Sequence, residues 1–130
     1  MPLEVLVADD DPVSLDTTSL LVEDICDCVV VAKALSLADV EWALAWGVSP
    51  HVAIVGYSFP KEGDGQKAAQ IIQAELPQAV IISYSGQEDL NFGTYNFLKG
   101  RDSAPELTAA LVHLHSLLSS AEEPAETEKG

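Results

Sequence analysis

The stretch HVAIVGYSFPKEGDG, residues 51–65, decides the fold that this sequence predicts. Its apolar start is typical of a strand that is covered on both faces, and Gly56 follows directly after it. Pro60, Gly63 and Gly65 then indicate an irregular loop. A buried strand that ends this abruptly favours a parallel α/β sheet, in which functional groups gather at the carboxyl ends of the strands.

The segments around this stretch repeat an alternation of strand and helix. Apolar and β-branched runs predict strands at residues 3–8, 29–34, 51–55, 79–83 and 96–98. Helical spacing predicts helices at residues 13–25, 36–47, 66–76 and 103–120. This order predicts a parallel sheet with right-handed crossovers and helices on both faces, which is a three-layer, doubly wound α/β domain. We expect one domain over residues 1–120 and a disordered acidic tail over residues 121–130.

Some local features of the helices can be predicted from single residues. Asp11 and Ser36 are suited to cap the first and second helices. Val13 and Leu20 belong to the apolar positions of the first helix, and Leu107, Ala110, Leu111, Leu114, Leu117 and Leu118 form a stripe on the last one. Trp42 and Trp46 are four residues apart, and we expect one of them to anchor the core and the other to be partly exposed.

Charge and cysteine content restrict the function. The 130 residues contain 21 acidic and 6 basic side chains, a formal net charge of −15. Such a surface repels phosphate backbones and anionic lipid, so we expect no nucleic-acid and no membrane partner. The start of the chain has no basic segment of a signal peptide, which predicts a cytoplasmic protein. Cys26 and Cys28 are too few for a metal site, and we expect them to pack in the core.

Polar residues follow the predicted strands where a functional site is expected. Asp9 and Asp10 end the first strand, Ser85 follows the fourth, and Lys99 follows the fifth. The third strand ends at Gly56. Each polar residue also has a structural interpretation: an acid can cap a helix, Ser85 can bond to backbone, and Lys99 can offset the repulsion between two carboxylates.

The motifs VLVADDDP, HVAIVGYSFP with a later DG, IISYSG and FLKGRDSAPEL resemble, in this order, those of the receiver domain of bacterial two-component response regulators. The resemblance covers residues 3–119 and implies a five-stranded sheet of order 2-1-3-4-5. It implies a receiver pocket formed by Asp9, Asp10, Ser85 and Lys99. In that family an aspartate at the end of the third strand accepts a phosphoryl group, and the acidic pair binds Mg²⁺.

Two departures from the family pattern set the functional expectation. Gly56 stands at the phosphoacceptor position and has no carboxylate, so Asp9 and Asp10 are expected to bind Mg²⁺ weakly at most. Residues 86–98 are too few for a full fourth helix, which we expect to be shortened or missing. The aromatic switch residue of the family corresponds to Asn96 here.

The sequence therefore predicts a pseudo-receiver, which is a phosphorylation-independent, non-enzymatic module for protein–protein interaction in signal transduction. Its expected partner is a signalling protein or a second copy of itself, and no cofactor is expected. Two alternatives stay open. In the first alternative, the receiver pocket binds a small molecule or ion non-covalently. In the second, a displaced acid such as Asp64 accepts the phosphoryl group.

Overall fold

The computed structural model describes residues 2–25, 27–56, 64–85, 95–98 and 103–122. Within this part of the chain five strands and four helices follow one another. In chain order they are β1 (Leu3–Ala8), α1 (Pro12–Glu23), β2 (Cys28–Ala34), α2 (Leu37–Ala45), β3 (Val52–Val55), α3 (Asp64–Glu75), β4 (Val80–Ser85), β5 (Tyr95–Leu98) and α4 (Ser103–Glu122).

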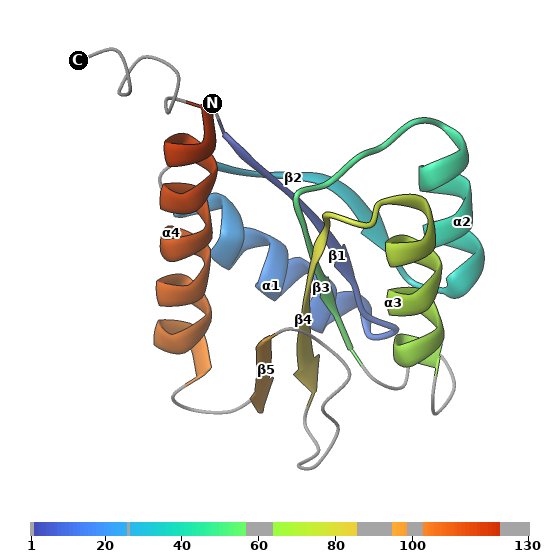
Figure 1. The fold of residues 1–130 in the computed structure, drawn as a ribbon. Helices are drawn as coiled ribbons and strands as arrows, with labels where there is room; N and C mark the ends of the chain where they lie inside the picture. The colour runs from blue at the N-terminus through green and yellow to red at the C-terminus, as the bar shows by residue number, and fades with distance from the viewer. Residues whose placement is uncertain (1, 26, 57–63, 86–94, 99–102, 123–130) are drawn as a thin grey trace.

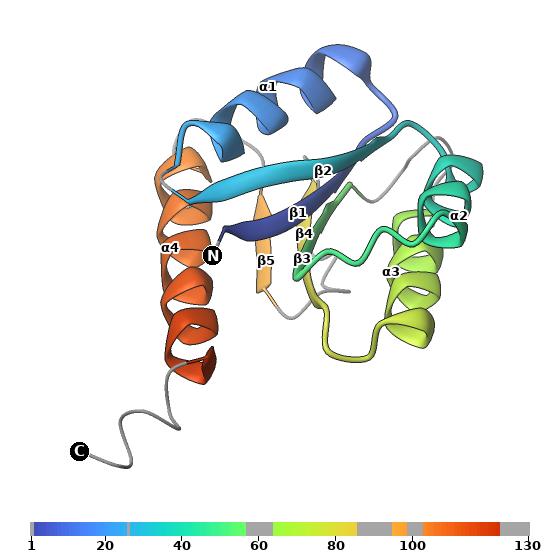
Figure 2. The same ribbon diagram turned by 90° about the horizontal axis from the view of Figure 1, so that it is seen from above.

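The strands form one sheet of order β2-β1-β3-β4-β5, and every neighbouring pair is parallel. Helices α1 and α4 cover one face, while α2 and α3 cover the other (Figure 1 and Figure 2). The α/β class, the parallel sheet and the three layers are therefore as the sequence predicts. The shortened or missing helix that the sequence predicts between β4 and β5 falls on residues 86–94, which lie outside the described residues.

Alternation along the strands divides the core between the two faces. On β1, Val5 and Val7 join the cluster beneath α1 and α4, whereas Leu6 and Ala8 join the cluster beneath α2 and α3. The second cluster is built largely from small side chains, since it consists of Leu6, Ala8, Ala34, Val40, Ala53, Val55, Ala68, Ala69, Ile72, Ala79 and Ile81. Small side chains let α2 and α3 pack closely on the sheet.

The first helix buries a different face from the one expected. Its buried residues are Leu15, Thr18, Ser19 and Val22, whereas Val13 and Leu20 are exposed. The Ser19 side chain can face the core because its hydroxyl donates to the carbonyl oxygen of Leu15 over 2.7 Å. Val13 and Leu20, two of the apolar positions at helical spacing, therefore lie on the solvent side of α1.

The second and last helices also depart from the expectation in part. Trp42 and Trp46 are both exposed, so the prediction that one of them anchors the core was wrong. On α4, Leu107, Leu111 and Leu114 are buried as predicted, but Leu117 is 51% exposed. Helix α4 ends at Glu122, two residues beyond the expected domain boundary, and residues 123–130 lie outside the described residues.

Cys28 is buried in the core, as its expected packing role requires, while Cys26 lies outside the described residues. None of the described helices combines the length and the apolar character that a membrane crossing needs.

Candidate functional site

The carboxyl edge of the sheet brings the ends of β1 and β3 together. Ala8 pairs with Val55, so the residues that follow them, Asp9 and Gly56, leave the sheet side by side. The backbone N–H of Gly56 donates to the carbonyl oxygen of Ala8 over 2.9 Å, and that of Asp9 donates to Ala34 on β2 over 2.9 Å. These two bonds extend the sheet by one residue and fix both positions.

Asp9 is a buried carboxylate, with 6% of its surface exposed. Its Oδ1 accepts a hydrogen bond from the backbone N–H of Asp11 over 3.0 Å, and its Oδ2 accepts one from the Ser14 hydroxyl over 2.8 Å. A buried carboxylate needs such donors because it has lost its water. Asp9 thus ties the end of β1 to the start of α1.

The neighbouring acids have other surroundings. Asp10 is exposed. Asp11 is the N-cap of α1, and its Oδ1 accepts a hydrogen bond from the backbone N–H of Val13 over 3.1 Å. The capping role expected of Asp11 is confirmed, and Asp9 is the one buried residue of the three consecutive aspartates.

Gly56 is not required by the backbone conformation. Among the described residues only Gly47 and Asp27 have positive φ, so the chain at Gly56 does not need a residue without a side chain. A β-carbon built on Gly56 would lie 3.7 Å from the Ala8 carbonyl oxygen, and 3.8 Å from both Cγ and Oδ2 of Asp9. These are ordinary contact distances, so the site has room for a β-carbon that would sit against the Asp9 carboxylate.

The rest of the predicted receiver pocket is described only in part. Ser85 is the last residue of β4 and pairs with Leu98 of β5, which places its backbone at the same edge of the sheet. The Ser85 side chain and all of Lys99 lie outside what the structure describes. The structure thus brings Asp9 and Gly56 together, and the roles of Ser85 and Lys99 stay predictions.

The described residues do not fit a complete Mg²⁺ site. No cluster of three or more His, Cys, Asp or Glu side chains that could hold a metal occurs among them. Both oxygens of Asp9 already accept hydrogen bonds from the protein, and position 56 supplies no side-chain oxygen ligand.

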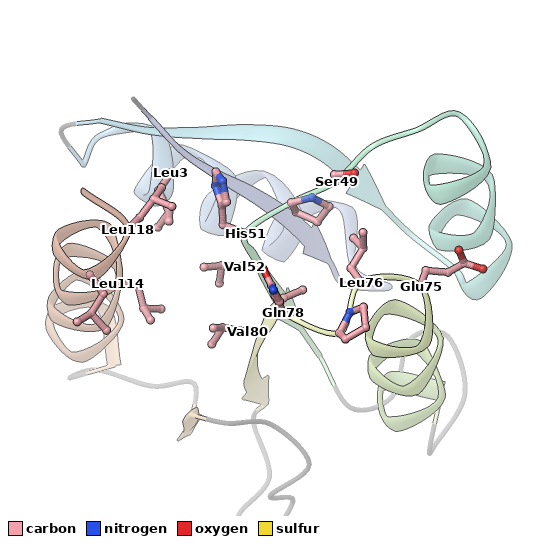
Figure 3. Close-up of a pocket in the computed structure, with 14 residues that line it drawn as sticks. Leu3, Ser49, His51, Val52, Glu75, Leu76, Gln78, Val80, Leu114 and Leu118 are labelled. Carbon is pink, nitrogen blue, oxygen red and sulfur yellow. The ribbon is translucent and has the colours of Figure 1, made fainter. Parts of the chain in front are cut away.

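A cavity of about 680 Å³ lies at the opposite edge of the sheet (Figure 3). Its walls include Leu3, Val52 and Val80, which are the first residues of β1, β3 and β4, together with Leu114 and Leu118 from α4. Because these residues mark the amino ends of the strands, the cavity does not coincide with the predicted receiver pocket.

His51, on the wall of this cavity, holds the strands together at their amino ends. Its Nδ1 accepts a hydrogen bond from the backbone N–H of Glu4 over 2.9 Å. Its own backbone N–H donates to the Glu4 carbonyl oxygen over 2.8 Å, and its carbonyl accepts from Val80 over 2.9 Å. Neither this role nor that of Ser14 could be predicted from the sequence, because both depend on contacts that form only in the folded chain.

Solved structures that resemble this chain include receiver domains of response regulators. The response regulator domain of Thermotoga maritima CheB is 22% identical, with a TM-score of 0.71, and the alignment covers 88% of this chain and 96% of that one. A response regulator receiver protein from Sinorhizobium medicae is 21% identical, with a TM-score of 0.73, and the alignment covers 87% of this chain and 94% of that one. The isolated receiver domain of RcsB from Salmonella enterica serovar Typhimurium, determined with the phosphomimetic BeF3⁻, is 25% identical, with a TM-score of 0.71. That alignment covers 87% of this chain and 90% of the RcsB domain.

The chain therefore has the fold of a response-regulator receiver domain. No family model matches the sequence, and no curated protein matches it either. The three alignments cover 87–88% of this chain, so the likeness extends over most of the domain.

Proposed function

We propose that this chain is a pseudo-receiver, a two-component signalling domain that acts through protein–protein contacts and without phosphorylation. The observation that carries the proposal is Gly56. It occupies the place after β3 that faces the buried Asp9 carboxylate, and it has no group that could accept a phosphoryl group.

The chemistry of phosphoryl transfer supports this proposal. An acyl phosphate forms only on a carboxylate, and the transferred group needs a cation to offset its charge. Glycine supplies neither the nucleophile nor a cation ligand at the end of β3. Asp9 is also bonded to Asp11 and Ser14 of its own chain, which gives it a structural role that needs no phosphate.

The interaction role follows from what the domain retains. The described residues include a five-stranded sheet, helices on both of its faces and the connection from β1 to α1, so the scaffold can present surfaces without the reaction. We propose a cytoplasmic signalling protein or a second copy of the chain as the partner. The net charge of −15 disfavours direct binding to nucleic acid or to an anionic membrane.

Two titrations followed by amide NMR test this function. Mg²⁺ is added first and beryllofluoride second, and the amides of Asp9, Asp10, Gly56, Ser85 and Lys99 are monitored. The proposal predicts no saturable shift confined to these residues. Saturable shifts with either addition would contradict it and would favour an ion-sensing or ligand-sensing pocket.

A phosphodonor experiment tests the remaining alternative, in which a displaced acid is the acceptor. The protein is incubated with acetyl phosphate and its intact mass is measured at once. The proposal predicts an unchanged mass. Addition of one phosphoryl group, located by peptide mapping at Asp64 or elsewhere, would replace the proposal with a true phosphoacceptor.

A further inference from the structure

The two tryptophans of the chain lie together on the solvent side of α2. Trp42 is 66% exposed and Trp46 is 72% exposed. Their ring centroids are 5.5 Å apart with an interplanar angle of 53°, so the rings contact each other. Single exposed apolar residues are common on protein surfaces, but two adjacent indoles present on the order of 300 Å² of aromatic surface, a size that often marks a binding site.

The packing of α2 leaves these rings without a structural task in the core. The helix turns its buried face to the sheet and α3 through Val40 and Ala43, with Leu37 and Leu44 partly buried beside them. Trp42 follows Val40 by two residues, which is about 200° around the helix. It therefore points away from the core, and an alanine or a lysine would serve the helix as well there.

The charges on this surface favour a cationic partner. Helix α2 contains two charged residues, Asp39 and Glu41, which are both acidic and exposed. The Oδ2 of Asp39 accepts a hydrogen bond from the backbone N–H of Leu35 over 3.0 Å, and its Oδ1 remains at the surface. Trp46 is the C-cap of the helix, where the helix dipole attracts positive charge, and no basic residue occupies the last turn. Indole faces themselves attract guanidinium and ammonium groups.

These observations argue against a second copy as the occupant. A copy of this chain would bring another net charge of −15 and the same two acidic residues to the interface. Opposed surfaces of like charge disfavour association. An arginine-containing segment instead matches both the aromatic faces and the flanking carboxylates, because arginine stacks on aromatic rings while it pairs with acids.

We propose that Trp42 and Trp46, flanked by Asp39 and Glu41, form a docking site for a cationic, arginine-containing segment of a partner protein. This inference rests on the proposed interaction function and specifies the partner's chemistry. Arginine side chains stack on the indoles and pair with the carboxylates, and apolar side chains of the segment cover the remaining ring surface.

A peptide titration tests the site directly. The probe is a synthetic amphipathic peptide of alternating arginine and leucine pairs, and the comparison peptide has glutamate at each arginine. Since both tryptophans of the chain belong to this surface, tryptophan fluorescence reports on it when the excitation wavelength is one that the three tyrosines do not absorb. We expect a saturable change with the arginine peptide, weaker binding at higher salt, and no binding of the glutamate peptide.

Variants separate specific docking from general attraction to an acidic protein. Calorimetry of Trp42→Ala is expected to show at least tenfold weaker binding of the arginine peptide. Glu41→Gln is expected to bind this peptide a few-fold more weakly, and its affinity should depend less on salt. The matched control is Leu20→Ala on α1, because Leu20 is 67% exposed and lies on the other face of the sheet. We expect this variant to bind within twofold of the parent chain.

Three results would overturn the inference. They are equal binding of the glutamate peptide, unchanged affinity of Trp42→Ala, and a dimer in sedimentation that Trp42→Ala dissolves. These readouts are independent of phosphorylation. Failure here with an unchanged mass after acetyl phosphate would remove only the docking site, whereas phosphoryl addition would remove the proposed function.

Discussion

Gly56 lies directly against Asp9, so that a β-carbon on Gly56 would stand 3.8 Å from Asp9 Oδ2. The space for a side chain exists, and the backbone there does not require glycine. The fold could therefore accept a carboxylate at position 56. Substitution of Gly56 can test whether the missing side chain is what removes the receiver reaction.

Substitution of Gly56 by aspartate is expected to create a Mg²⁺ site. In the absence of Mg²⁺, the new carboxylate faces Asp9, and the like charges should lower the free energy of unfolding by about 1–2 kcal/mol relative to Gly56→Ala. Added Mg²⁺ should restore this loss, because a cation that binds only the native state stabilises it. Urea denaturation with and without Mg²⁺ measures both effects.

Gly56→Ala is the matched control, since it adds the β-carbon without the charge. We expect it to be neutral or up to about 1 kcal/mol more stable than the parent chain, and insensitive to Mg²⁺. If Gly56→Asp binds no Mg²⁺ in calorimetry, the remaining pocket is not like that of a receiver.

Asp9 and Asp10 are adjacent in sequence but differ in burial, which predicts different effects on stability. Asp9→Ala leaves the Asp11 N–H and the Ser14 hydroxyl without their acceptor, and should cost about 1–3 kcal/mol. Asp10→Ala removes an exposed side chain and should change stability by less than about 0.5 kcal/mol. Equal losses for the two variants in urea denaturation would refute the structural role of Asp9.

His51 should contribute to stability through its ring nitrogen. His51→Ala removes the acceptor of the Glu4 N–H at the amino end of the sheet, with an expected cost of about 1–2 kcal/mol. His113→Ala is the control, because His113 is exposed on α4 and should be close to neutral. Thermal unfolding of the two variants measures this effect. A His51→Ala protein with the same thermal stability as the parent chain would show that the Glu4 contact is dispensable.

The sequence predicts most of the architecture because strands and caps depend on neighbouring residues. The apolar run at residues 3–8 coincides with β1, and Ser36 caps α2 by accepting a hydrogen bond from the Asp39 N–H over 3.3 Å. The buried face of α1 could not be predicted, because Thr18 and Ser19 are buried there in place of apolar residues. A hydroxyl can be buried when a carbonyl oxygen accepts a hydrogen bond from it, and this carbonyl is in reach only in the folded helix.

The exposure of both tryptophans also depends on tertiary packing. The layer beneath α2 and α3 consists largely of alanines, so it leaves no space for an indole between helix and sheet. In the candidate site, the sequence predicts that Asp9 and Gly56 lie at one edge, but not the bond from Ser14 that orients the carboxylate.

The loss of the phosphoacceptor is best tested by the intact mass of the parent chain after incubation with acetyl phosphate and Mg²⁺. We predict a mass equal to that of the untreated protein, because Gly56 offers no acceptor. A stoichiometric gain of one phosphoryl group would contradict it and would show that another acid in this chain performs the receiver reaction.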